Sequence, residues 1–214
     1  MKQNNEIKVL YGGEASERME GQDTRLLEFI LSFPSVRQRL NALLTDQQRE
    51  SIIEGYMQRE RVAFREGRSA VATMDGEVVA KATHESIGVW NDGRPVYEIG
   101  GVVTLEDERF RGKHLSSLVQ DRCMQEVILQ DPLALFLVVT SNLSLIARYS
   151  QWGHEKLGLC TEIGVEGWTQ ILRRRNGVSK SMTTAEIMRV RKQYPDHRSF
   201  LIDMRQGKKQ EVQQ

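Results

Sequence analysis

Apolar and polar residues follow two different periods along the chain, and the first part has the helical period. A short strand, Ile7–Tyr11, ends at Gly12-Gly13. After it, apolar residues recur at the three- and four-residue spacing of amphipathic helices. The positions that share such faces are Leu26, Leu27 and Ile30, then Val36, Leu40, Leu43 and Leu44, then Ile52, Ile53 and Tyr56. We expect a helical layer that packs on a sheet; the alternative is an arm that binds a partner.

Two residues, Pro34 and Thr45, mark helix ends in this part of the chain. Pro34 ends the first helical segment, because proline lacks the backbone N–H that a helix interior needs. Thr45 is placed to cap the helix that follows, since a threonine side chain accepts a bond from an unpaired amide of the first turn.

From Ser69 the period changes to that of strands. Ser69–Met74 and Glu77–His84 flank Asp75-Gly76, and a two-residue Asp-Gly turn favours a β-hairpin because both residues adopt positive φ. Val96–Thr104 is a further strand, interrupted by Gly100-Gly101. A glycine pair inside a strand indicates a bulge or a close approach to the backbone by other atoms.

A helix and a buried strand follow. Leu115, Leu118, Val119, Cys123 and Val127 fall on one helical stripe, and Asp131-Pro132 ends it. The apolar run Leu133–Val139 is typical of a strand covered on both faces. A short helix is expected at Ser144–Trp152, and a closing strand at Ser199–Asp203. This order of elements predicts an α/β fold with a sheet of mixed direction.

Composition and charge argue against several classes of function. The chain has 214 residues, of which 39% are hydrophobic and 28% charged, typical of a globular domain. The net charge of +1 argues against a strongly basic nucleic-acid binder. No apolar run reaches the roughly 18 residues of a membrane span. Because the start has no cationic region followed by an apolar stretch, we expect no signal peptide and a cytoplasmic protein.

Several kinds of catalytic site lack their motifs. The two cysteines, Cys123 and Cys160, form no CxxC pair, and the four histidines form no HxxxH pair, so no metal site is expected. The sequence also lacks the GxSxG motif of serine hydrolases and the GxxxxGK[ST] motif of P-loop proteins.

The segment with the most chemical information is the turn before the long helix, Arg111-Gly112-Lys113-His114-Leu115-Ser116. The first turn of a helix has backbone N–H groups without intrahelical partners, and the helix dipole adds positive charge there. A pyrophosphate could accept bonds from several of those groups. Arg111 and Lys113 flank the turn, and Gly112 leaves the backbone accessible.

This turn resembles the acyl-CoA-binding motif [Q/R]-x-x-G-x-[G/A] of the GNAT superfamily of N-acetyltransferases. The resemblance continues in a second family motif, N-x-x-A-x-x-x-Y-x-x-x-G-F, for which this chain has Asn142, Tyr149 and Gly153 in register. It covers about residues 61–163, in the family's order of elements.

The chain departs from both motifs. His114 stands for the first motif glycine, Ser116 for the final Gly/Ala, Leu145 for the usual alanine and His154 for the usual aromatic residue. The loop from Val103 to Arg111 is longer than usual and carries acidic residues. A side chain at position 114 fits if its φ is negative and helical, because only its backbone N–H then faces the phosphate.

The resemblance implies a GNAT-type fold, with a mixed, mostly antiparallel central sheet whose strands four and five splay apart, flanked by helices. It implies direct transfer of an acetyl group from acetyl-CoA, without a metal, to a small-molecule or peptide amine. The residues it assigns to binding the cofactor are Val102, Val103 and Thr104 on the strand, Arg111, Gly112, Lys113, His114, Leu115 and Ser116 at the turn, and Asn142.

Two proton transfers need catalytic groups, because an amine must lose a proton before it attacks and the leaving thiolate must gain one. Glu98, on the strand before the glycine pair, is the first candidate for the base, and Glu85 the second. Glu98 could equally be a surface carboxylate of an alternating strand. Tyr149 is assigned as the acid by the resemblance. His84, His114 and His154 could act as bases by their chemistry, but we expect structural roles.

We expect three parts in the chain: residues 1–60 as an acceptor lobe, 61–163 as the acyl-CoA-binding core, and 164–214 as a basic helix, closing strand and tail. The sequence leaves the oligomeric state open, with a homodimer as one possibility, and we expect no membrane or nucleic-acid partner. Two other functions fit the sequence. One is transfer of a longer acyl chain by the same fold, and the other is a CoA-sensing or nucleic-acid-binding module that uses Arg173–Arg175.

Overall fold

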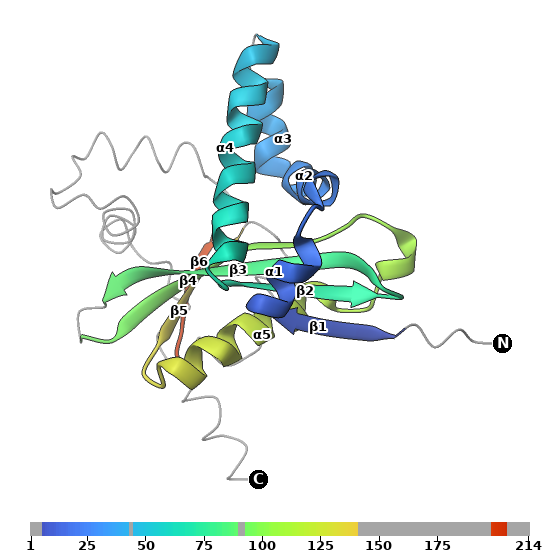
Figure 1. Ribbon diagram of the computed structural model, residues 1–214. Helices are drawn as coiled ribbons and strands as arrows, with labels where there is room; N and C mark the ends of the chain where they lie inside the picture. Colours follow the sequence, from blue (N-terminus) through green and yellow to red (C-terminus); the bar gives the residue numbers. More distant parts are fainter. Residues whose placement is uncertain (1–5, 43–44, 90–92, 141–197, 205–214) are drawn as a thin grey trace, which may run out of the picture. The chain divides into compact units, whose positions relative to one another are not determined.

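The computed structural model describes residues 6–42, 45–89, 93–140 and 198–204 (Figure 1). The strands are β1 (Ile7–Tyr11), β2 (Ser69–Met74), β3 (Glu77–Val89), β4 (Pro95–Thr104), β5 (Leu135–Thr140) and β6 (Arg198–Ile202). The helices are α1 (Gly13–Met19), α2 (Asp23–Ser32), α3 (Pro34–Asn41), α4 (Asp46–Arg65) and α5 (Leu115–Gln130), with a short 3₁₀ helix, η1, at Glu108–Phe110. The predicted helix Ser144–Trp152 lies outside the described residues.

The chain divides into two compact units. The first combines Met1–His84 with Gly100–Val127, and the second combines Glu85–Ile99 with Ile128–Gln214. β3 and β4 each contribute residues to both units. The predicted division into 1–60, 61–163 and 164–214 stays a prediction.

The strands follow one another in the sheet in chain order, from β1 to β6. In the first unit, β2 pairs antiparallel with both β1 and β3, and its register with β3 shifts between Ala72 and Thr73. In the second unit, β4 runs parallel to β5, with Val96 opposite Leu135 and Ile99 opposite Val138, and β6 runs antiparallel to β5. The predicted sheet of mixed, mostly antiparallel direction is therefore confirmed, whereas the splaying of strands four and five stays a prediction.

The predicted hairpin is present with its predicted turn. β2 ends at Met74 and β3 begins at Glu77. Asp75 has φ 52° and Gly76 has φ 82°, the two positive values that a type I′ turn requires.

In the first unit, the N-terminal helices form one layer with a common core. Leu26, Phe29 and Ile30 of α2 and Met57 and Phe64 of α4 are buried in one cluster with residues of three strands. The strand residues of this cluster are Val71, Val78 and Val103. The helices therefore pack on the sheet, as predicted, rather than forming a separate arm.

Local signals set the bounds of these helices. Thr45 accepts a bond from the Gln48 amide and the Gln48 side chain accepts one from the Thr45 amide, which completes a capping box at the start of α4. Pro34 ends the preceding segment, as predicted, and also begins α3, because proline fits the first turn of a helix. The sequence analysis missed α1, whose seven residues are too few for a clear helical period.

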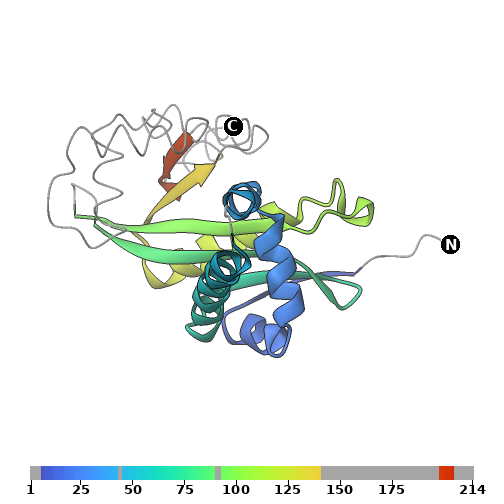
Figure 2. The ribbon, with the colours of Figure 1, turned by 90° about the horizontal axis from the view of Figure 1, so that it is seen from above.

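α5 lies on the opposite side of the first-unit strands β2 and β3 from α4 (Figure 1 and Figure 2). Leu115, Val119, Cys123 and Val127 of the predicted stripe are buried, but Leu118 is 39% exposed, and Met124 is buried in its place. The buried face of α5 is therefore turned toward Met124, and Leu118 lies at its edge. In the second unit, Leu135–Val138 of the predicted strand Leu133–Val139 are almost completely buried, but Leu133 is 51% exposed because it precedes β5, which begins at Leu135.

Candidate functional site

The turn before α5 is exposed and has several backbone amides without acceptors. Arg111, Gly112, Lys113 and His114 are all exposed. The Arg111 amide donates to the Glu108 carbonyl at 3.2 Å, and the Lys113 amide donates to the Phe110 carbonyl at 3.2 Å. Within the described part of the chain, four neighbouring amides donate to no group: Gly112, His114, Leu115 and Ser116. The turn can therefore donate to an anion from several amides at once.

His114 differs from the expected conformation. Its φ is +54°, in the left-handed region, and Gly112 beside it has φ +74°. The condition of a negative, helical φ at position 114 is therefore not met, and the carbonyl of His114 accepts bonds from the amides of Ser117 and Leu118 at the start of α5. Histidine adopts this region more readily than most residues, at a cost of about 1 kcal/mol relative to glycine. The turn thus has a left-handed conformation, which glycine adopts most readily, at a residue with an exposed imidazole.

Two carboxylates of the loop before the turn, those of Glu106 and Asp107, pair with neighbouring arginines and not with the unpaired amides of the turn. Asp107 accepts bonds from the Arg109 backbone amide at 2.8 Å and from its guanidinium at 2.9 Å. These bonds hold the pKa of Asp107 below its usual value. Glu106 lies 3.4 Å from the Arg37 guanidinium.

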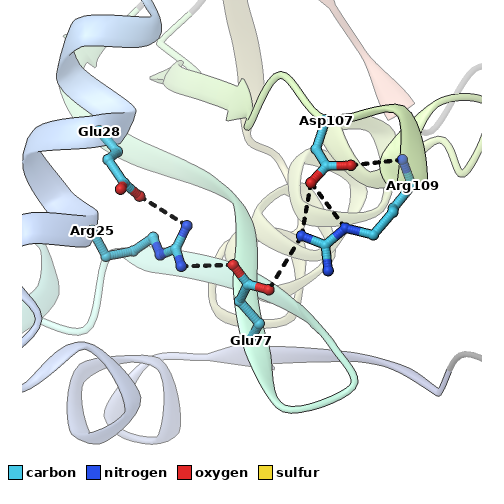
Figure 3. Close-up of polar contacts among 5 residues, drawn as sticks. All are labelled: Arg25, Glu28, Glu77, Asp107 and Arg109. Carbon is cyan, nitrogen blue, oxygen red and sulfur yellow. Dashed lines mark hydrogen bonds and ion pairs between the residues drawn. The ribbon is translucent and has the colours of Figure 1, made fainter.

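A chain of ion pairs connects this loop with the helical layer (Figure 3). The Arg109 guanidinium lies 3.6 Å from Glu77 at the start of β3, and Glu77 lies 2.7 Å from Arg25 of α2, which also pairs with Glu28. Each such exposed pair contributes at most about 1 kcal/mol. Together they hold the loop by contacts that leave the turn itself uncovered.

The glycine pair of β4 contacts a buried ion pair that was not predicted from the sequence. Lys81 of β3 has a completely buried side chain, and its ammonium lies 2.7 Å from the Glu60 carboxylate of α4. The same ammonium donates to the Gly101 carbonyl at 3.3 Å, and the Thr83 hydroxyl donates to the Gly100 carbonyl at 3.2 Å. This is the close approach to the backbone that the glycines predicted.

Gly101 has a conformation that requires glycine. Its φ is +57°, and a Cβ atom there would lie 2.9 Å from the Lys81 ammonium and 3.0 Å from the Thr83 hydroxyl. The left-handed φ lies inside β4, which continues from Pro95 to Thr104, and the predicted bulge stays a prediction.

Beyond the glycines, β4 resumes the alternation of a strand. The Leu105 amide donates to the Val79 carbonyl of β3 at 2.9 Å. Since backbone groups alternate in direction along a strand, those of Val102 and Thr104 point away from β3 and those of Val103 point toward it. The Thr104 hydroxyl is buried and has no partner within the described residues. This edge can therefore offer backbone groups to an extended ligand.

The candidate catalytic residues lie in other parts of the chain. Glu98 is half-buried in β4 of the second unit, opposite Leu137 of β5 in the register. Glu85 is exposed. Asn142 and Tyr149 lie outside the described residues.

His84 has a structural contact rather than the properties of a general base. Its Nε2 atom lies 2.6 Å from the Tyr11 hydroxyl, and its ring is stacked on that of Tyr11. Burial, with the nearby charge of Arg68, lowers the pKa of His84 to about 4, and burial raises the pKa of Tyr11 to about 12. A neutral imidazole that accepts a hydrogen bond from the Tyr11 hydroxyl joins β1 and β3 across β2, which agrees with the structural role expected from the sequence.

This pair predicts a loss of stability in acid. Because the pKa of His84 is lower in the folded protein than in the unfolded chain, the unfolded chain binds the proton more readily below pH 6.5. The free energy of unfolding should therefore fall by about 2 kcal/mol from this group as the pH drops from 6.5 toward 4. Urea denaturation at several pH values, compared with His84→Gln, measures the effect. Parallel losses in both proteins would contradict it.

The described residues contain no group of three or more histidine, cysteine or acidic side chains placed to hold a metal ion. None of the helices in the same part of the chain has an apolar stretch long enough to cross a bilayer.

No family model matches this chain, and no curated protein sequence matches it. Its fold is similar to several solved structures at low identity. A GCN5-related N-acetyltransferase from Kribbella flavida is 18% identical with a TM-score of 0.45, over 70% of this chain and 33% of that one. Glucosamine-6-phosphate N-acetyltransferase from Arabidopsis thaliana is 16% identical with a TM-score of 0.43, over 68% of this chain and 89% of that one.

A third similar structure is ribosomal-protein-alanine N-acetyltransferase from Brucella melitensis, 15% identical with a TM-score of 0.46, over 68% of this chain and 83% of that one. This chain spans about a third of the length of the Kribbella protein. The strand directions of this chain agree with the mixed, mostly antiparallel sheet that the sequence predicted.

Proposed function

We propose that this chain is an N-acyltransferase that moves an acetyl group from acetyl-CoA to an amine. The observation that carries the proposal is the exposed turn at the start of α5, where the amides of Gly112, His114, Leu115 and Ser116 have no acceptor within the described residues. A diphosphate is the part of CoA that can accept bonds from several such amides, and the positive end of the helix dipole favours its charge.

Two cations support this assignment. Arg111 and Lys113 flank the open amides, and within the described residues neither forms an ion pair. Arg109, only two residues earlier, is by contrast held by Asp107 and Glu77. The two unpaired cations can pair with phosphate oxygens, whereas Arg109 holds the loop in place.

The pantetheine arm would extend along the edge of β4 that points away from β3. There the backbone groups of Val102 and Thr104 are placed to pair with its amides, while the Val103 side chain anchors the strand in the core. We assign the side-chain amide of Asn142 to the same arm.

The proposed transfer is a single displacement. The amine nitrogen attacks the thioester carbonyl carbon, the C–N bond forms, and the C–S bond breaks. Glu98 takes the proton that the amine loses, and Tyr149 gives a proton to the leaving thiolate. A base is required because an amine with a pKa near 10 is mostly protonated at neutral pH.

Calorimetry tests whether the turn binds the diphosphate of CoA. The ligands are CoA, acetyl-CoA, palmitoyl-CoA and pantetheine, which lacks the diphosphate. CoA and acetyl-CoA should bind and pantetheine should not. The double variant Arg111→Gln/Lys113→Gln should bind CoA about tenfold to a hundredfold more weakly, because two charge-assisted contacts are lost. The matched control is Arg109→Gln, which removes one cation of the same loop and should change the affinity by less than about threefold.

Thiol release from acetyl-CoA in the presence of primary amines then tests the reaction. Spermidine, glucosamine 6-phosphate and a peptide with a free N-terminal alanine and a lysine cover different acceptor classes. Binding of palmitoyl-CoA in preference to acetyl-CoA would favour a longer acyl donor. Binding of CoA without transfer to any amine would favour a CoA sensor, and failure to bind CoA would overturn the proposal.

A further inference from the structure

Within the described residues, β1 pairs with a neighbouring strand on one side only. It is the first strand in the order of the sheet and lies next to β2 (Figure 1). At its start the Asp75 amide donates to the Glu6 carbonyl at 3.2 Å, and at its end the Gly12 amide donates to the Ser69 carbonyl at 3.1 Å. Because backbone groups alternate in direction along an antiparallel strand, the even-numbered residues of β1 are those that bond with β2.

The odd-numbered residues Ile7, Val9 and Tyr11 therefore direct their N–H and C=O groups away from β2. Among the residues that the structure describes, none bonds with these groups. The three residues are placed symmetrically about Val9. A second β1 strand that runs antiparallel can pair Val9 with its own copy and Ile7 with Tyr11, and every outward group then has a partner.

The side chains of the same three residues fit this pairing. They share one face of the strand and are half-buried. Valine would lie opposite valine and isoleucine opposite tyrosine, and cross-strand pairs of aromatic and β-branched residues are favourable. The Tyr11 ring is already held, because its hydroxyl lies 2.6 Å from Nε2 of His84. Pairing therefore requires little additional ordering of this side chain.

The charges on β1 do not oppose this pairing. An exposed lysine on an edge strand usually discourages pairing with another strand. Lys8 is such a residue, but its ammonium lies 3.1 Å from the Glu6 carboxylate, so the two charges balance. In a pairing about Val9, Lys8 lies opposite Leu10 of the second copy, and no like charges of β1 are directly opposite one another. Leu10 itself packs against the core cluster of the first unit, which keeps β1 in place.

We propose that the outward edge of β1 is an interaction surface, and that its partner is β1 of a second copy of this chain, paired antiparallel about Val9. The inference goes beyond the proposed function and does not depend on it. A second copy is the partner that the observations favour, because the same three residues supply both halves of the hydrogen-bond pattern and of the side-chain pairs. The assembly is then a dimer with a twofold axis at Val9.

Disulfide crosslinking of the full chain tests the register. In the proposed pairing the two Val9 residues lie directly opposite each other, with Cα atoms about 5.5 Å apart, which is within the range of a disulfide bond. Val9→Cys should therefore form a covalent dimer on mild oxidation, seen by electrophoresis without reductant. Lys8→Cys is the matched control, because residue 8 faces residue 10 of the second copy and its own copy lies beyond about 7 Å. The wild type, treated in the same way, shows any crosslinking by Cys123 and Cys160.

Sedimentation equilibrium tests the association without a crosslink. The average mass of the wild type should rise from that of one chain toward twice that value as the protein concentration increases to about 100 µM, because an interface of one short strand is weak. Val9→Pro removes an N–H group that β2 does not use, and proline is tolerated at such edge positions, so this variant should stay folded and associate at least about tenfold more weakly. Val9→Thr keeps the N–H group and the β-branched shape, and should associate like the wild type to within about threefold.

Equal crosslinking of Val9→Cys and Lys8→Cys would overturn the register, since random collisions would then explain both. A wild type that remains a single chain at every concentration would overturn the proposal and leave the edge of β1 to an extended segment of a different protein. If Val9→Pro fails to fold, the two cysteine variants still decide the question.

Discussion

Lys81→Met should lower the free energy of unfolding by about 3–5 kcal/mol, the usual effect of removing one partner of a buried ion pair. The Lys81 side chain is completely buried and that of Glu60 is only 15% exposed. Methionine fills the space of the lysine stem but cannot pair with the carboxylate. One oxygen of Glu60 is already buried without a partner, so the variant would leave the whole carboxylate poorly solvated. Chemical denaturation measured at pH 7 tests the effect.

The double variant Lys81→Met/Glu60→Gln separates the lost charge from the lost packing. Replacing both charges leaves no unpaired ion, so most of the stability should return. Lys8→Met is the matched control, because Lys8 pairs with Glu6 at 3.1 Å but both side chains are exposed. It should change the stability by less than about 0.5 kcal/mol. A Lys81→Met protein as stable as the Lys8→Met protein would show that the buried pair contributes nothing.

The elements of the fold were predictable where a local signal decides the structure. Asp75-Gly76 specified its hairpin turn because few dipeptides adopt two positive φ values, and Thr45 specified the start of α4 through its cap. The glycine pair at 100 and 101 indicated the close approach of other atoms to the β4 backbone, which the contacts of Lys81 and Thr83 with the two carbonyls show. Each of these signals consists of residues that are close together in the sequence.

Of the candidate site, only the local turn could be predicted from the sequence, and the side-chain contacts between distant segments could not. Arg111–Ser116 could be proposed from the sequence because a turn before a helix is a local structure, but the φ of His114 could not be predicted, since it depends on how the turn enters α5. Glu60 and Lys81 were missed because their pairing joins residues of α4 and β3 that are distant in sequence. The one available signal was a lysine within the apolar strand Val78–Ala82, where a charged residue requires a partner.

Gly101→Ala should destabilise the first unit by about 2–4 kcal/mol. The left-handed φ of +57° costs an alanine about 1–2 kcal/mol relative to glycine. The added Cβ would also lie 2.9 Å from the Lys81 ammonium and 3.0 Å from the Thr83 hydroxyl, so both side chains would have to move. Moving Lys81 weakens its pair with Glu60, and this loss adds to the backbone strain.

Gly100→Ala provides a control at the adjacent residue. The φ of Gly100 is not in the left-handed region, and a Cβ atom there would have no neighbour within 4 Å. This variant should keep wild-type stability within about 0.5 kcal/mol, because alanine reduces the freedom of the unfolded chain without strain in the folded one. Thermal and urea denaturation of both variants measures the difference. Equal effects at the two positions would show that the conformation of Gly101 and its contacts with Lys81 and Thr83 do not hold the β4 backbone.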